Sequence, residues 1–393
     1  MTLLNKNKIK VCLKRNLRVC PERSRRACPE RSRRVFVAMS GGVDSSVAAL
    51  LLKRQGYDVT GVFMKYWVDA ESAFGVNENH CCSLEARRDA MRVCVKIDIP
   101  FLTWDFQKIF KRVVADDFIH GYRKGITPNS CVVCNKEIKF GLFIRKALEM
   151  GADYIATGHY VKFKTFNLKH DKSASCFTLH VSRDTNKDQS YFLWTLTQKQ
   201  LKHCLFPLGN YTKPEVRNLA KKFRLPTTTK KDSQEVCFVG KTNLKEFLKK
   251  WLPEKQGKIL NTKGEILGSH LGVWFFTIGQ RQGIKLSGGP YFVVSKDIKK
   301  NILVVAKEQD KSLFSKKAVV GDINWISGQT PKLPLNCLIR IRYRQPLQKA
   351  TILACKGKRI SVSFEKPQKA ITQGQSAVFY KKDGEMIGGG VLL

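Results

Sequence analysis

A short loop with two glycines is the first segment of this chain whose residue types and spacing suggest chemistry. The run Ser40-Gly41-Gly42-Val43-Asp44-Ser45-Ser46 follows the apolar residues 35–39 and opens a helical pattern. Glycine lets a backbone approach an anion closely, and a helix start offers free N–H groups at the positive end of its dipole. The loop lacks the lysine of a Walker A site and the spacing of a dinucleotide fingerprint. It therefore predicts another kind of phosphate site, with an ordinary strand-to-helix turn as the alternative.

Two cysteines lie in polar, lysine-rich segments and are candidates for nucleophilic chemistry. Cys134 precedes a helix that we expect to begin near Asn135, and a helix start beside lysines favours the thiolate. Cys237 follows Lys230 and Lys231. Two such thiols suit sulfur transfer, in which one carries the mobile sulfur and the other resolves the linkage by thiol–disulfide exchange. A Cys/His pair of the hydrolase type and inert buried thiols are the alternatives; the inert interpretation fits Cys94, Cys204, Cys337 and Cys355.

The residues around the glycine loop predict the first unit of a parallel sheet. After Asp44, apolar residues recur at helical spacing, and a basic pair with Gly56 ends the helix. A second apolar strand, residues 59–64, follows, and this order implies a right-handed crossover and parallel pairing. Ligands bind at the carboxyl ends of such strands. Met64 lies at one of these ends, where it lines an adenine pocket or belongs to the core.

The charge of the chain points to a polyanionic partner. Its 393 residues include 71 basic and 32 acidic side chains, for a net charge of +39. Such a field favours nucleic acid and makes binding sensitive to salt. A lysine-rich composition inherited from an AT-rich genome is the alternative. A membrane surface is disfavoured because the basic residues are dispersed, and no apolar stretch approaches the eighteen or so residues of a membrane span.

The first 34 residues differ from the rest of the chain. Cys20-Pro-Glu-Arg-Ser-Arg-Arg26 recurs as Cys28-Pro-Glu-Arg-Ser-Arg-Arg34, and the segment has too few apolar residues to bury. We expect a disordered, inserted element, with a mitochondrial transit peptide as the alternative. The 13 cysteines show no disulfide-scaffold spacing and no signal peptide precedes them, so we expect a reducing cytosol.

Beyond this extension we expect an α/β domain at 35–240, a small central domain at 241–310 and a β-rich domain at 311–393. Closely spaced short strands predict a small barrel or sandwich at the C-terminus. Alternating Arg340, Arg342 and Arg344 would share one strand face, either toward phosphates or as a solvated edge. The expected helices are 83–97 (apolar at Leu84, Ala90, Met91 and Cys94), 138–150 and one starting at Thr212; the expected strands are 101–104, 153–157, 161–166, 177–182, 318–320, 337–343, 350–354, 359–364 and 376–380.

The motifs appear in an order that resembles one family. The Ser-Gly-Gly-x-Asp-Ser loop alone resembles the PP-loop of ATP pyrophosphatases, and from residue 35 to the C-terminus the chain resembles the tRNA-specific 2-thiouridylases of bacteria and mitochondria. The resemblance implies a PP-loop parallel-sheet domain, a small central domain and a C-terminal antiparallel β-barrel. The motifs that carry it are 40–46, Phe63–Trp67, Cys81-Cys82-Ser83, Cys134–Phe140, Gly151–Tyr160, Lys187–Leu193, Phe206–Gly209, Lys231–Ser233, Cys237-Phe238 and Thr277–Arg281.

The resemblance also implies a reaction. ATP adenylates the C2 carbonyl oxygen of the wobble uridine, U34, in tRNAs for lysine, glutamate and glutamine. A persulfide sulfur then replaces the activated oxygen, which yields 2-thiouridine, AMP and pyrophosphate. By this resemblance Cys237 carries the persulfide and Cys134 is the paired catalytic cysteine.

The same resemblance implies roles for further residues. Asp44 would help to organise Mg²⁺, although a helix-capping role is the alternative. For His159 and Tyr343 a purely structural role is the alternative. The residues expected to hold ATP are Ala38, Met39, Ser40, Gly41, Gly42, Val43, Asp44, Ser45, Met64 and Gly158. The residues expected to contact tRNA are Asn129, Ser130 and Cys131 against the target base, and His159, Lys187, Asp188, Gln189, Arg342, Tyr343 and Gln375 elsewhere.

One segment departs from the family pattern. The family usually has Thr-Pro-Asn-Pro-Asp where this chain has Thr127-Pro-Asn-Ser-Cys131, so a thiol replaces a carboxylate that would be a general acid or base. Cys131 is then a third soft ligand beside Cys134 and Cys237, and three thiolates can hold a [4Fe–4S] cluster. The persulfide and cluster routes both stay open, and we favour the persulfide. The Cys131-x-x-Cys134 pair alone is a weak metal signal, because a closed site needs four ligands.

The expected partners follow from this chemistry. They are tRNA and a persulfide donor, either a cysteine desulfurase or a relay protein, acting with a monomeric enzyme in the bacterial cytoplasm; the mitochondrial matrix is the alternative location. Two other functions remain to be weighed. An adenylating ligase or amidotransferase with a small substrate would not need the net charge of +39. A tRNA-binding protein without catalysis would not need an intact glycine loop.

Overall fold

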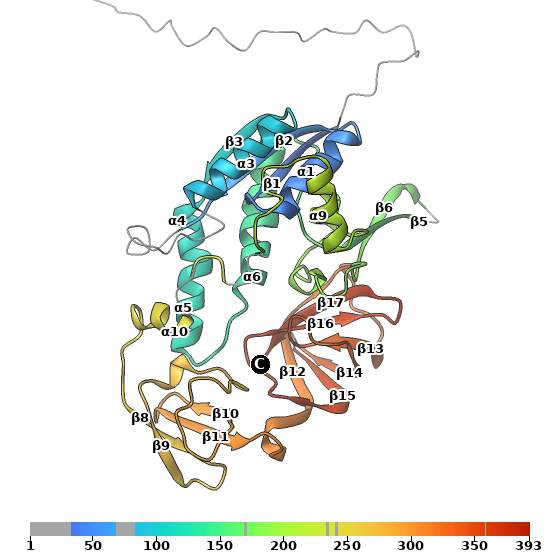
Figure 1. The fold of residues 1–393 in the computed structure, drawn as a ribbon. Coiled ribbons are helices and arrows are strands. Elements are labelled where there is room, and N and C mark those ends of the chain that lie inside the picture. The colour runs from blue at the N-terminus through green and yellow to red at the C-terminus, as the bar shows by residue number, and fades with distance from the viewer. Residues whose placement is uncertain (1–32, 68–82, 169–170, 233–235, 240–242, 358) are drawn as a thin grey trace, which may run out of the picture. The chain divides into compact units, whose positions relative to one another are not determined.

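The computed structural model describes residues 33–67, 83–168, 171–232, 236–239, 243–357 and 359–393 (Figure 1). The chain divides into Met1–Ser32 and Arg33–Leu393, and only the second unit is described. The repeat-containing extension and the Cys81-Cys82 motif therefore lie outside the described residues. No helix of the described part is long and apolar enough to cross a membrane.

A five-stranded parallel sheet forms the N-terminal part of the second unit, as the sequence predicts. Its strand order is β3-β2-β1-β4-β7, so β1 lies at the centre. Both faces of β1 are buried: Phe36 and Ala38 belong to one core cluster, while Val35 and Val37 belong to another. Parallel strands covered on both faces read as continuous apolar runs. The strands are β1 Arg34–Met39, β2 Asp58–Lys65, β3 Phe101–Asp105, β4 Tyr154–Ala156 and β7 Cys204–Leu205.

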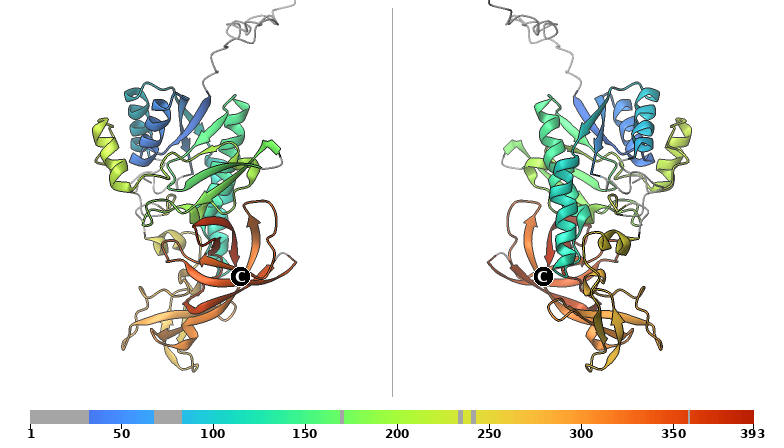
Figure 2. Two further views of the ribbon diagram at one scale, coloured as in Figure 1. Left: turned by 90° about the vertical axis from the view of Figure 1, so that its right-hand side faces the viewer. Right: turned by 90° about the vertical axis from the view of Figure 1, so that its left-hand side faces the viewer.

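Helices cover the two faces of this sheet (Figure 2). Helix α1 (Val43–Arg54) packs on β1, β2 and α9 (Lys213–Lys222), and α3 (Leu84–Lys96) packs on β2. The expected helix at 83–97 is confirmed, but Leu84 is 69 % exposed and Met91 is 39 % exposed, so its buried face is Ala86, Ala90, Val93 and Cys94 instead. The predicted helix start at Thr212 is confirmed by a capping box between Thr212 and Glu215.

The other face of the sheet is covered by two long helices that each contain a π-helical stretch. The first runs through α4 (Gln107–Phe110), η1 (Lys111–Ala115) and α5 (Asp116–Arg123). The second runs through α6 (Ser130–Val133), η2 (Cys134–Leu142) and α7 (Phe143–Glu149). Our expectation of a helix start near Asn135 is wrong, because Asn129 caps the helix by accepting from the Val132 N–H at 3.4 Å. Cys134 therefore begins a π-helical stretch inside the helix, a feature frequent at functional sites.

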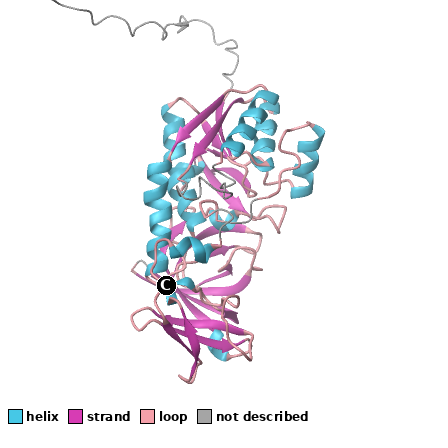
Figure 3. Cartoon of the chain, turned by 60° about the vertical axis from the view of Figure 1, so that its left-hand side comes forward, coloured by secondary structure: helices cyan, strands magenta, loops and turns pink. Residues whose placement is uncertain are grey.

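The C-terminal part is a closed antiparallel barrel, which confirms the predicted β-rich domain (Figure 3). Six strands follow the order β12-β15-β14-β13-β16-β17, and pairing of β12 with β17 closes the ring. The hairpin β5–β6 matches the two predicted strands around residues 161–182, and it extends the barrel sheet because Glu385 pairs with His180. The strands are β5 Lys162–Leu168, β6 Asp171–His180, β12 Phe314–Trp325, β13 Leu335–Arg340, β14 Gln348–Lys356, β15 Arg359–Lys369, β16 Ser376–Tyr380 and β17 Glu385–Leu392.

The predicted arginine face of this barrel is wrong. Strand β13 ends at Arg340, whose guanidinium is buried and lies 2.7 Å from the Asp188 carboxylate. Arg342 follows the strand and donates to the Thr372 hydroxyl at 3.1 Å. Arg344 has a φ of 66°, which belongs to a turn and not to a strand. The three side chains therefore do not form one charged stripe.

A smaller four-stranded sheet lies between these two parts of the sequence. Its order is β10-β11-β8-β9, and the parallel pair β8–β11 joins two antiparallel pairs. The remaining elements are β8 Gly257–Leu260, β9 Ile266–His270, β10 Tyr291–Asp297, β11 Ile302–Lys307, α8 Gln198–Leu201, α10 Leu244–Lys249, η3 Ser190–Phe192, η4 Val273–Phe275 and η5 Lys311–Leu313.

Candidate functional site

The loop between β1 and α1 is shaped by its own hydroxyl groups. The Ser45 Oγ accepts from the Ser40 N–H at 3.2 Å and donates to the Gly42 carbonyl at 3.1 Å. The Ser46 hydroxyl donates to the same carbonyl at 2.8 Å. Gly41 has a φ of 70°, and a Cβ there would lie 2.2 Å from the Ala86 carbonyl oxygen. The turn therefore requires glycine at this position and holds the start of α1 in a fixed shape.

The loop lies against the carboxyl ends of neighbouring strands. Gly158, just beyond β4, approaches so closely that a Cβ would lie 2.9 Å from the Ser45 nitrogen. Met64, near the end of β2, is buried beside the same space. Gly42, not Asp44, is the N-cap residue of α1. The Asp44 carboxylate instead accepts from the Tyr160 hydroxyl at 2.7 Å and from the Lys213 ammonium at 2.6 Å, so the helix-capping alternative is excluded.

One cavity joins this loop to the two candidate thiols. Its volume is about 760 Å³, which is within the range of sites for small ligands and cofactors. The cavity is lined by nine of the ten residues expected to hold ATP; Gly41 belongs to the same turn without lining it. Its further lining includes Ser130, Cys131, Cys134, His159, Lys187, Gln189, Lys230, Lys231, Asp232, Cys237, Phe238 and Tyr343.

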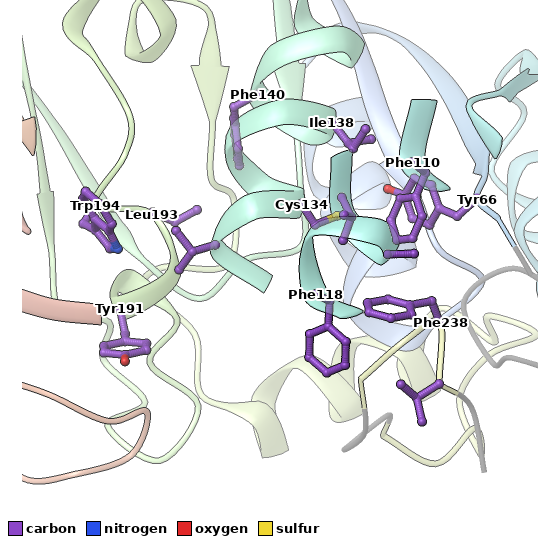
Figure 4. Close-up of a cluster of buried hydrophobic side chains, with 14 of the residues drawn as sticks. Tyr66, Phe110, Phe118, Cys134, Ile138, Phe140, Tyr191, Leu193, Trp194 and Phe238 are labelled. Atoms are coloured by element: carbon purple, nitrogen blue, oxygen red, sulfur yellow. The ribbon is translucent and has the colours of Figure 1, made fainter. Parts of the chain in front are cut away.

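The thiol of Cys134 is held inside an aromatic cluster. Its residue is only 6 % exposed and belongs to the same core as Tyr66, Phe110 and Ile138 (Figure 4). The rings of Tyr66 and Phe110 are stacked with their centroids 4.7 Å apart. Because Cys134 is part of a helix that packs on the sheet, the backbone itself fixes where this sulfur lies.

Cys237 is half-buried and lies in a short turn, residues 236–239. The Val239 N–H donates to the Val236 carbonyl at 3.0 Å. The neighbouring Phe238 is buried, and its ring centroid lies 5.8 Å from that of Phe110 and 5.2 Å from that of Phe118 (Figure 4). The aromatic side chain therefore anchors the turn that carries the sulfur of Cys237.

The third thiol, Cys131, is exposed in the first turn of α6 and lines the same cavity. Within the described ranges, however, no three His, Cys, Asp or Glu side chains are grouped so that they could hold a metal ion. Cys131, Cys134 and Cys237 thus do not form the ligand set that a [4Fe–4S] cluster needs, and we derive no step through one. Cys134 and Cys237 are both thiols here, and the described residues form no disulfide.

Three family models match consecutive parts of the chain. A model described as tRNA methyl transferase HUP domain matches residues 33–241. Models described as tRNA methyl transferase PRC-barrel domain and as Aminomethyltransferase beta-barrel domain match residues 245–307 and 315–392. Among solved structures, the match to the NMN synthetase from Francisella tularensis covers 52 % of this chain and 67 % of that one, at 15 % identity and a TM-score of 0.32.

Full-length relatives decide the family. The chain is 44 % identical over 364 residues to the tRNA-specific 2-thiouridylase MnmA from Alkaliphilus oremlandii, which covers 91 % of this chain and 96 % of the relative. It is also 44 % identical to the enzymes of the same description from Geobacillus thermodenitrificans and Streptococcus sanguinis, over 91 % of this chain and 94 % of each relative. The chain belongs to the tRNA-specific 2-thiouridylase family. The resemblance stated from the sequence motifs is confirmed.

In this thiouridylase, a network of ion pairs lies beside the cavity. The sequence alone did not reveal this network. Asp232 accepts from Lys187 at 2.6 Å, from Arg217 at 2.6 Å and from Lys213 at 3.0 Å. Burial raises the pKa of Asp232, but the bonds from Lys187 and Lys213 outweigh it and lower the pKa to about 2. Lys230 forms a further ion pair with Asp89. Lys213 was not singled out from the sequence, because residues 212–215 were interpreted only as the start of a helix.

Three residues of the predicted tRNA set lie together on one segment. Lys187 and Gln189 line the cavity, and the Gln189 side chain accepts from the Tyr160 N–H at 3.0 Å. Asp188 between them is 2 % exposed, and its carboxylate is bound by Arg340, by the Ser190 hydroxyl and by the Ser182 N–H. These bonds hold the side chain inside the protein and link the sheet domain to the barrel, and the contact of Asp188 with tRNA stays a prediction.

His159 is buried beside the PP-loop and lines the same cavity. Its Nδ1 lies 2.7 Å from the Thr157 hydroxyl. Burial lowers the pKa of the imidazole well below its usual value, and the nearby Lys139 lowers it further. Both effects favour the neutral imidazole, which can form hydrogen bonds, and the contact of His159 with tRNA stays a prediction.

The other expected tRNA residues connect the start of α6 with the barrel. The Gln375 side chain donates to the Thr127 carbonyl at 2.9 Å, and the Asn129 amide lies 3.5 Å from the Ser376 hydroxyl. Tyr343 lines the cavity with its ring centroid 4.5 Å from that of Phe192. Gln375 and Asn129 thus have partners within the protein, and their contacts with tRNA, like those of Ser130, Tyr343 and Arg342, stay predictions.

Proposed function

We propose that this chain is an ATP-dependent tRNA uridine 2-sulfurtransferase that acts on the wobble uridine of tRNAs for lysine, glutamate and glutamine. The observation that supports this most directly is the single cavity that the PP-loop, Cys134 and Cys237 line together. Adenylation of the C2 oxygen and attack of sulfur on C2 involve one carbonyl group of one base, so both sets of groups must serve one space. The relatives are named tRNA-specific 2-thiouridylases.

In the first step, the PP-loop binds ATP. The hydroxyl-braced turn at Ser40–Ser46 and the first turn of α1 present N–H groups to the phosphates. One carboxylate together with substrate phosphates suffices for Mg²⁺, and Asp44 lines the cavity at the right loop. Bound there, Mg²⁺ would neutralise phosphate charge. The C2 oxygen of the uridine attacks the α-phosphorus and pyrophosphate leaves with the electron pair of the broken P–O bond.

In the second step, a persulfide on Cys237 supplies sulfur. Its terminal sulfur attacks C2, and AMP leaves with the C2 oxygen. The Cys134 thiolate then attacks the Cys237 sulfur, which breaks the S–S bond, leaves 2-thiouridine on the tRNA and forms a Cys134–Cys237 disulfide. An external thiol reductant supplies two electrons to restore both thiols. A cysteine desulfurase or a relay protein reloads Cys237.

The assignment of regions follows the same proposal. Residues 35–240 form the catalytic domain, 241–310 a domain that contacts tRNA and 311–393 the barrel. The enzyme acts as a monomer in the bacterial cytoplasm. The surplus of basic residues supports binding of the polyanionic substrate.

The test is mass spectrometry of the wobble nucleoside after incubation of the full chain with tRNA, ATP, Mg²⁺ and a persulfide donor. We expect 2-thiouridine with ATP and unmodified uridine without it. Unmodified uridine in both, under conditions where a related thiouridylase is active, would refute the proposal. Formation of a small adenylate without tRNA would instead indicate a ligase.

A further inference from the structure

Lys213 lies between the PP-loop and the segment that precedes Cys237. It is the first residue of α9, and its side chain is only 10 % exposed. Its ammonium lies 2.6 Å from the Asp44 carboxylate and 3.0 Å from the Asp232 carboxylate. Both carboxylates line the cavity, whereas Lys213 is not part of its lining and is bonded to these two groups that are.

The two carboxylates are not held equally. Asp232 is bound by Lys187 and Arg217 as well as by Lys213, whereas Asp44 is bound by Lys213 and the neutral Tyr160. Asp232 would therefore keep two cationic partners if Lys213 moved to another anion. Lys213 can therefore leave Asp232 without leaving that carboxylate unpaired.

A polyphosphate bound at the PP-loop brings several negative charges next to Asp44. An ammonium is a compact charge that binds phosphate well, and charge-assisted bonds in a partly buried site are strong. A carboxylate that shares the same amine competes with that bond. We propose that Lys213 binds the polyphosphate of ATP, that Asp232 is the carboxylate it leaves, and that the pair adds to the discrimination of ATP from AMP.

This inference rests on the proposed use of ATP, and its test separates the two. The affinities of the full chain for ATP, pyrophosphate and AMP are measured by isothermal titration calorimetry. We expect K213M to weaken ATP and pyrophosphate binding about tenfold and to leave AMP binding within twofold. K213R should restore most of the ATP affinity, because it keeps the charge. K221M, which removes an exposed lysine from the same helix, is the matched control.

The Asp232→Asn variant tests the competing carboxylate, and its effect should have the opposite sign. Removing the negative charge frees Lys213 for phosphate, so ATP should bind a few-fold more tightly while AMP binding stays unchanged. Because Asp232 also pairs with Lys187 and Arg217, this gain must disappear in the K213M/D232N double variant if it is due to Lys213. A purely structural Lys213 would lower the affinities for ATP and AMP together, and that result would overturn the inference. Equal ATP binding by K213M and wild type would also overturn it. Failure of the wild-type chain to bind ATP at all would instead refute the proposed function.

Discussion

The two thiols at the cavity are held in different ways. Cys134 is part of the continuous helix that starts at Ser130, so backbone hydrogen bonds and core packing fix its position. Cys237 lies in a turn that is anchored by the ring of Phe238, while the ion pairs of Asp232 lie five residues earlier in the chain. Side-chain contacts can be exchanged, whereas a buried helix moves only as a unit. This difference supports Cys237 as the carrier of mobile sulfur and Cys134 as the fixed thiol that resolves the linkage.

Replacing each thiol should give the largest effects and should distinguish the two roles. We expect C134S and C237S each to reduce thiolation to less than about 1 % of the wild-type rate, because neither hydroxyl replaces a thiolate nucleophile. C134S should accumulate tRNA joined to Cys237 through a disulfide, and C237S should not. Mass spectrometry of the protein–tRNA adduct makes the distinction.

The control for this pair is C176S, which changes a partly exposed cysteine in the β5–β6 hairpin. Its thiolation rate should stay within twofold of wild type. Accumulation of the adduct in C237S in place of C134S would reverse the assigned roles.

The PP-loop should be sensitive to a single methyl group. In G41A the new Cβ would meet the backbone carbonyl of Ala86 at 2.2 Å, and the residue would retain a φ that alanine disfavours. We expect ATP affinity to fall at least about tenfold, measured by calorimetry. Alkylation of Cys237 by iodoacetamide should be unchanged in the absence of ATP, because the ring contacts of Phe238 and the ion pairs of Asp232 are intact.

G264A is the matched control, since a Cβ at Gly264 would meet no atom within 4 Å and its φ of 89° imposes a similar backbone strain. Normal ATP binding by G41A would show that the close approach to Ala86 does not shape the loop.

The apolar anchor of the Cys237 turn can be weakened without touching either thiol. Truncating a buried Phe to Ala costs roughly 3 kcal/mol or more in a packed core. Phe238 also contacts Phe247 in addition to Phe110 and Phe118. We expect F238A to increase alkylation of Cys237 and to lower the thiolation rate while leaving ATP affinity unchanged.

F238L keeps an apolar side chain at the same position. Its rates of Cys237 alkylation and of thiolation should therefore change less than those of F238A. If alkylation of Cys237 is the same in F238A and wild type, the aromatic contact is not what holds the turn.

The ion pairs of Asp232 predict a small dependence of the protein's stability on pH. The pKa of Asp232 is lowered to about 2, so its contribution is present above roughly pH 4 and is lost as the pH falls toward 2. Because Asp232 is partly exposed, solvent screening limits this contribution to no more than about 2 kcal/mol. The free energy of unfolding of wild type and D232N is measured with urea between pH 5 and 2. It should fall less steeply with decreasing pH in D232N than in wild type. Equal slopes would show that the ion pairs do not stabilise the fold.

Local patterns in the sequence predicted most of the elements and the phosphate loop. The apolar run before Ser40 and the two glycines specify a strand and a turn within a few residues, and the structure has both. The thiols and the loop were expected at one site from the family resemblance, and the cavity brings them together.

Two of the three errors arose where distant residues decide the structure. The arginine stripe failed because Arg340 is paired with Asp188, 152 residues earlier in the chain. The role of Lys213 was missed because Asp44 is 169 residues away. The helix start at Ser130 was placed too late because Asn129, its cap, was considered only as a contact for tRNA. No short-range pattern contains the first two pairings, whereas the bond from the Val132 N–H to Asn129 is a local signal that was overlooked.

The most direct test of the account follows labelled sulfur in a single turnover. Cys237 is loaded with a radiolabelled persulfide, unreacted donor is removed, and tRNA is added with or without ATP. We predict that the label moves from the protein to the wobble uridine only when ATP is present, because the C2 oxygen must first be adenylated in the same cavity. Label that reaches tRNA equally without ATP, or that stays on the protein with ATP, would contradict the claim that one cavity serves both steps.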